Sequence, residues 1–114
     1  MIKNILNRGK DLAISIAIKK VVNLKIKQFG EVLKSDFDST TKTIDIEVWL
    51  KGEKDILKVF VDKYSIKEEN NKHYLIVNNI TSSREWLTSV LEKYVTNKKF
   101  QIPNEYVKIV KVVI

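Results

Sequence analysis

The sequence predicts an α+β fold, in which an antiparallel meander sheet of about five strands is packed by an N-terminal and a C-terminal amphipathic helix. Three features predict this fold. Two segments repeat apolar residues at helical spacing, the segments between them alternate apolar and polar residues, and the connections are short. With 114 residues, 44% of them hydrophobic, residues 1–114 have the size and composition of a single α+β domain. The expected element order is α-β-β-β-β-α-β.

The first expected element is an amphipathic helix over about residues 2–19. Its apolar stripe consists of Ile2, Ile5, Leu6, Gly9, Leu12, Ala13, Ile16 and Ala17. Ile14 and Ile18 fall on the opposite, polar side, so either the last turn is enclosed all round or this second face meets a partner. Gly9 costs about 1 kcal/mol relative to alanine within a helix, and we expect it to mark the close approach of another element.

Four strands are expected next. Alternation from Val22 predicts a strand whose phase slips near Gly30, where we expect a β-bulge or bend. The clearest strand covers residues 43–51, and turn-forming residues separate it from strands over about residues 56–66 and 73–80.

A second helix is expected over about residues 83–97. Ser82 and Glu85 have the spacing of a capping box, with Ser82 as N-cap, and Trp86 is expected in the core. Pro103 then interrupts the chain, and the β-branched residues of the segment 106–114 predict a final strand.

The later strands contain more apolar residues than a sheet with one wet face can bury. The second face could be covered by the chain itself, by another subunit, or by an apolar ligand held between a curved sheet and the helices. Seven residues are candidates for an apolar ligand site or an interface: Trp49, Phe60, Tyr64, Tyr74, Ile76, Ile14 and Ile18. Trp49 is a candidate because it falls among the polar residues of its strand.

The net charge of +7 is unevenly distributed, with +6 in residues 1–34, −3 in residues 35–70 and +4 in residues 71–114. Nineteen of the 21 cations are lysines, which suit loose attraction to an anionic surface better than base recognition, so specific nucleic-acid binding is not expected. The densest basic cluster is the candidate site for an anionic surface, and its alternative interpretation is a solvated face: Lys19, Lys20, Lys25 and Lys27.

No catalytic or metal-binding constellation is recognisable, and we expect no cofactor. The chain has no cysteine, and its one histidine, His73, has no partners at ligand spacing. The carboxylate pairs Asp36 with Asp38 and Asp45 with Glu47 are interpreted as solvated strand charges, and Ser82 with Ser83 as helix caps.

The apolar run of residues 12–18 is too short to span a bilayer, and lysines rather than a cleavage site follow it. We therefore expect a cytoplasmic protein, either free or peripheral to a membrane. The expected function is a non-enzymatic binding module that holds an apolar ligand or lipid, or associates with membrane surfaces. The alternatives are a homo-oligomeric or protein-docking module that uses the C-terminal strand, and non-specific nucleic-acid binding through the lysine-rich face.

Overall fold

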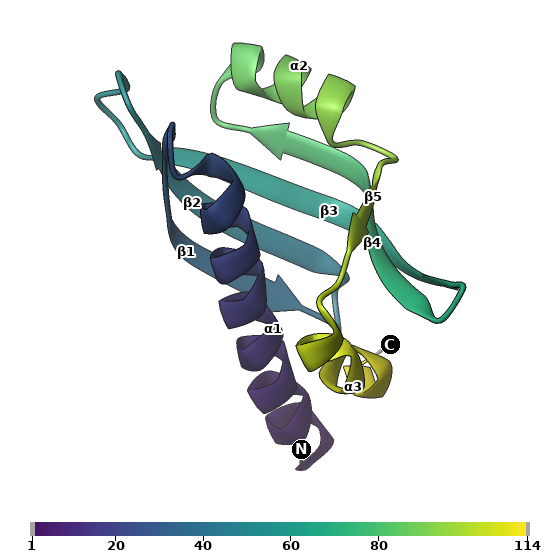
Figure 1. Cartoon of the computed structure of the whole chain (residues 1–114). Helices are drawn as coiled ribbons and strands as arrows, with labels where there is room; N and C mark the ends of the chain where they lie inside the picture. The colour runs from purple at the N-terminus through teal and green to yellow at the C-terminus, as the bar shows by residue number, and fades with distance from the viewer. Residues whose placement is uncertain (1, 114) are drawn as a thin grey trace.

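The computed structural model describes the backbone of residues 2–113 and the side chains of residues 9–108. One antiparallel sheet has the strand order β1-β2-β3-β4-β5 (Figure 1). The elements are α1 Ile2–Ile26, β1 Gly30–Asp38, β2 Thr43–Leu50, β3 Leu57–Glu69, β4 Lys72–Ser82, α2 Glu85–Tyr94, β5 Lys99–Gln101 and α3 Asn104–Val113. The predicted α+β class and the order α-β-β-β-β-α-β are confirmed, and the helix α3 follows.

The start of the first predicted strand and the last predicted strand are helical, whereas the first strand is observed from Gly30 as β1. Val22 belongs to α1, because Val22 and Ile26 continue the i, i+4 row of Ile14 and Ile18. The segment predicted as the last strand lies in α3 as far as residue 113, and the fifth strand is Lys99–Gln101. Polar residues recur at helical spacing in α3, and this pattern outweighs the β-branched content: Asn104, Glu105, Lys108 and Lys111.

The apolar surplus of β3 arises from a change of phase within the strand. The register with β4 shifts between Val61 and Tyr64, which is the signature of a β-bulge. Residues before and after the shift therefore face the same core: Leu57, Val59, Val61, Tyr64 and Ile66. In β4 the core-facing position changes in the same way, from Val77 to Ile80. Tyr64, Ile66 and Ile80, which strict alternation assigns to the second face of the sheet, therefore lie on the core-facing side.

Both packing helices cover the same face of the curled sheet. Ile14 of α1 and Leu87 of α2 belong to one buried cluster together with residues of β1 to β4. Leu91 and Val95 continue the α2 contact, whereas Trp86, which the sequence places in the core, is exposed. Some apolar side chains remain exposed on β1, β2 and β3 and just before β3: Leu33, Trp49, Ile56 and Phe60.

The predicted capping box at the start of α2 does not form. Arg84 is the N-cap residue and makes no side-chain capping bond. The hydroxyl of Ser82 instead donates to the carbonyl oxygen of Arg84 at 2.7 Å, and the amide of Ser82 donates to the hydroxyl of Thr88 at 2.9 Å. Ser82 therefore holds the end of β4 against α2.

The two glycines singled out in the sequence have different roles from those predicted. The bulge of β1 lies between Val32 and Lys34 rather than at Gly30. A Cβ at Gly30 would clash with the backbone of Trp49, so the close approach of β1 and β2 requires glycine there. A Cβ at Gly9 would meet no other element within 4 Å, so the expected close approach at this position is wrong.

The side of α1 that faces the sheet differs from the predicted one, although Ala17 of the predicted apolar stripe is buried. Ile14 is only 6% exposed and packs in the core, whereas Leu12 and Ile16 of the predicted apolar stripe are 64% and 54% exposed. Ile2, Ile5 and Leu6 of that stripe lie outside the described side chains. Ile14 and Ile18 therefore do not form a partner face, because they pack within the chain.

Polar side chains of α1 explain this orientation. The amide of Val32 donates to Oδ1 of Asn23 at 2.6 Å, that of Phe37 to Oγ of Ser15 at 2.7 Å, and that of Ser39 to Oδ2 of Asp11 at 3.0 Å. The amides of Val32 and Phe37 lie on the free edge of β1, the amide of Ser39 directly follows the strand, and all three would otherwise lack partners. The extra residue at the β1 bulge allows Val32 and Phe37, five positions apart, to point to the same side.

Candidate functional site

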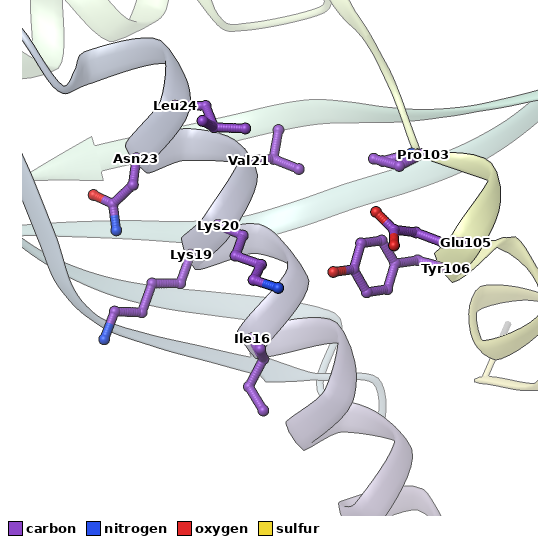
Figure 2. Close-up of a pocket in the computed structure, with 9 residues that line it drawn as sticks. All are labelled: Ile16, Lys19, Lys20, Val21, Asn23, Leu24, Pro103, Glu105 and Tyr106. Atoms are coloured by element: carbon purple, nitrogen blue, oxygen red, sulfur yellow. The ribbon is translucent and has the colours of Figure 1, made fainter.

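A groove of about 610 Å³ lies between α1 and α3 (Figure 2). Side chains of both helices and of the segment before α3 line it: Ile16, Lys19, Lys20, Val21, Asn23, Leu24, Pro103, Glu105 and Tyr106. Five of these nine residues are apolar or aromatic, and three are charged. The groove therefore combines apolar side chains with ionic groups.

The α1 wall follows from helical spacing. Ile16, Lys20 and Leu24 are four residues apart and lie in one row on the side of α1 away from the core. Leu24 is 72% exposed, so most of its apolar side chain lies in solvent in the free protein. In Figure 2, Val21 points from α1 towards Pro103, and Lys20 points towards Tyr106.

The α3 wall is positioned by the end of the sheet. The amide of Ile102 donates to the carbonyl oxygen of His73 at 2.8 Å, which anchors the chain just before Pro103. The amide of Tyr106 donates to the carbonyl oxygen of Pro103 at 3.0 Å in the first turn of α3. The helix then packs against α1, and the half-buried ring of Tyr106 closes one side of the groove.

Most of the net charge belongs to the two helices that form the groove. By sequence, α1 contains six Lys or Arg residues and one acid, and α3 contains two Lys residues and one acid. Their combined charge of +6 is nearly the whole net charge of +7. Within the groove, Lys19 and Lys20 outweigh Glu105. A positive potential on this side of the molecule attracts anions to the groove.

Two of the four predicted basic residues line the groove, namely Lys19 and Lys20. Lys25 and Lys27 do not line it. They are exposed at and just after the C-terminal end of α1, rather than on a strand as predicted.

The predicted apolar groove between sheet and helices is not assembled. Tyr64 lies in the core, where its ring centroid is 5.1 Å from that of Phe37 and burial raises the pKa of its hydroxyl well above the ordinary value. Phe60 is exposed on the opposite face of the sheet, because the bulge separates the two residues in phase. Tyr74 and Ile76 are half-buried on β4 opposite the short strand β5. Trp49 is exposed on β2 and pairs with Glu31.

Sequence reasoning missed the apolar residues of the actual groove. The longest apolar stripe of α1 places Ile16 in the core, and the alternation from Val22 places Leu24 on a strand. Tyr106 was missed because the β-branched content after Pro103 predicts a strand there. A helical period from Asn104 to Lys108 was the signal that could have identified the α3 wall.

The polar residues considered as metal ligands in the sequence do not form a metal site among the described residues. His73 is buried at the start of β4, with Nε2 3.3 Å from a carboxylate oxygen of Glu68. Among the described residues, no three His, Cys, Asp or Glu side chains are grouped as metal ligands. In the same part of the chain, no helix is both long enough and apolar enough to cross a membrane.

Comparison of the chain with protein-family models, with curated proteins and with solved structures found no match. The physical properties of the α1–α3 groove therefore have to carry the functional interpretation.

Proposed function

We propose that the chain is a non-enzymatic binding module, and that the face formed by α1 and α3 binds amphiphilic ligands with an apolar part and an anionic group. The observation that carries this proposal is the groove itself. The exposed apolar side chains of Ile16 and Leu24 flank Lys19 and Lys20 there, and the two helices of the groove hold nearly all of the net charge.

The expected affinity for one small ligand is low. Covering the exposed parts of Ile16 and Leu24 contributes about 1 kcal/mol each, roughly half of the value for full burial. Each lysine beside an anionic group at a solvent-exposed site adds roughly 0.5–1 kcal/mol. The total of about 3–4 kcal/mol corresponds to a Kd of about 1 mM or weaker.

Dodecyl phosphate, kept below its micelle-forming concentration, is a suitable probe for this proposal. We expect titration into the ¹⁵N-labelled chain to shift the amide resonances of Ile16, Leu24 and Tyr106 before those of the outer sheet face. The variant Ile16→Asn should weaken binding about fivefold, since about 1 kcal/mol of apolar contact is lost.

Ile56→Asn is the matched control, because Ile56 is 50% exposed and lies away from the groove, whereas Ile16 is 54% exposed within it. The proposal fails if dodecyl phosphate causes no saturable shifts, or if the two variants weaken binding equally.

The alternative of edge pairing by a C-terminal strand has lost its structural basis. The segment 106–114 is helical as far as residue 113 and packs on α1, so it presents no strand edge in the described chain.

A further inference from the structure

The apolar side of α1 extends beyond the groove. Leu12 is not among the groove-lining residues, but it lies one helical turn before Ile16 on the outward side of α1 and is more exposed than Ile16. The distance along the helix axis from Leu12 to Leu24 is about 18 Å, at 1.5 Å per residue. A ligand inside the groove leaves Leu12 in water, whereas a flat surface laid along α1 covers Leu12, Ile16 and Leu24 together.

The lysines of this side are placed to complement an apolar contact. Lys19 and Lys20 stand between Ile16 and Leu24 in the sequence of α1, and both side chains are exposed. Long lysine side chains can keep their ammonium groups at the level of anionic headgroups while neighbouring leucine and isoleucine side chains enter the apolar region. This combination is the one found in helices that lie in the plane of a membrane surface.

Charge on the other side of the molecule reinforces a single orientation. The sheet face opposite α1 carries the acids Asp36, Asp45 and Glu47 together with two lysines, Lys34 and Lys58. Residues 35–70 together carry a net charge of −3, in contrast to the +6 of α1 and α3. An anionic surface therefore attracts the helical side more strongly than the exposed sheet face, where charges of both signs are mixed.

An anionic lipid surface fits these features better than a nucleic acid. Contacts to a phosphate backbone are made by cations and do not bury exposed leucine and isoleucine side chains, and base recognition favours arginine. On the described side chains of α1 the cations are all lysine, and Leu12, Ile16 and Leu24 are the most exposed apolar residues of the helix.

We infer that the α1–α3 face docks on an anionic lipid bilayer, with α1 lying along the surface, its side chains Leu12, Ile16 and Leu24 inserted, and Lys19 and Lys20 at the headgroups. This inference rests on the proposed function of the same face. It adds that the physiological occupant is a membrane surface rather than a single extracted amphiphile.

Co-sedimentation of the full chain with lipid vesicles tests the inference. We expect binding to vesicles of phosphatidylcholine that contain one third phosphatidylglycerol, and at least about tenfold weaker binding to vesicles of phosphatidylcholine alone. Binding to the anionic vesicles should decrease as salt is added, because the lysine contacts are screened.

Three variants locate the contact. Lys19→Gln combined with Lys20→Gln should weaken vesicle binding about tenfold, whereas Lys58→Gln combined with Lys63→Gln, on exposed positions of β3, should not. Leu12→Asn should weaken vesicle binding but leave dodecyl phosphate binding unchanged, because Leu12 lies outside the groove. These positions are exposed, and a urea unfolding curve for each variant checks that the fold is retained.

The outcomes separate this inference from the proposed function. Binding of dodecyl phosphate without binding of anionic vesicles would overturn the membrane inference alone. Absence of both would overturn both proposals. Vesicle binding that Leu12→Asn leaves unchanged, or binding to double-stranded DNA that exceeds vesicle binding at equal salt, would also refute the membrane contact described here.

Discussion

Replacing Ser15 by alanine should destabilise the protein, although alanine is the better helix former. Ser15 is 4% exposed, and its hydroxyl accepts the amide hydrogen of Phe37 at 2.7 Å on the free edge of β1. The same hydroxyl donates to the carbonyl oxygen of Asp11, one turn earlier in α1, at 2.8 Å. The variant leaves the Phe37 amide buried without a partner.

The expected loss follows from two opposing effects. An unsatisfied buried amide costs about 1–3 kcal/mol. Alanine returns roughly 0.5 kcal/mol of helix propensity. The free energy of unfolding should therefore fall by about 0.5–2.5 kcal/mol, and the Tm by about 4 °C for each kcal/mol.

Urea unfolding followed by tryptophan fluorescence measures the change, and hydrogen exchange locates it. The amide of Phe37 should lose protection more than the other amides of β1. Ser89→Ala is the control, because Ser89 is an exposed serine of the helix α2 and its replacement should be neutral or slightly stabilising. An unchanged unfolding free energy with full protection at Phe37 would refute the idea that α1 satisfies the edge of β1.

Two further predictions concern stability. Gly9→Ala should raise the free energy of unfolding by up to about 1 kcal/mol, since the added methyl group meets open space in a helix. Gly30→Ala should lower the free energy of unfolding, because the added methyl group clashes with the β2 backbone. Urea midpoints that move in the same direction for both variants would contradict this interpretation. Tyr64→Phe should leave stability at neutral pH unchanged or raise it by up to about 1 kcal/mol, because the buried hydroxyl has no hydrogen-bond partner among the described residues. Burial raises the pKa of Tyr64 above the ordinary 10, so its contribution is complete below pH 10 and is lost as the pH rises further, while the unfolded chain ionises. Tyr64→Phe should therefore lose less stability than the parent chain in unfolding curves measured above pH 10, and an equal loss would contradict the burial of this hydroxyl.

Local sequence signals determined the class of the fold and most of its strands. The alternation over residues 43–51 predicts β2, observed as Thr43–Leu50, and the turn expected before His73 is present. At that turn Asn70 and Asn71 have φ values of 53° and 65°, which asparagine tolerates in a tight hairpin between β3 and β4. Signals of this kind act within a few residues, so they can be read without knowledge of the neighbours.

Local sequence signals could not show which side of α1 packs against the sheet. α1 carries one apolar row at Leu12 and Ile16 and another at Ile14 and Ile18, and helical periodicity alone does not say which row is buried. The free edge of β1 selects the second row, because the same side of α1 presents the oxygen atoms of Asp11 and Ser15 to unpaired amides. The row of Leu12 and Ile16 is left in solvent together with the neighbouring lysines, and these exposed residues form the candidate binding face.

The sequence by itself thus determined an α+β chain with a meander sheet, a basic N-terminal helix and tight asparagine and glycine turns. The tertiary structure alone decided the bulges that turn Tyr64 into the core and the side of α1 that meets water. The physical reason is that these features depend on satisfying backbone hydrogen bonds between segments far apart in the chain. The sequence of a helix does not reveal which unpaired amides of a distant strand edge its polar side chains will bind.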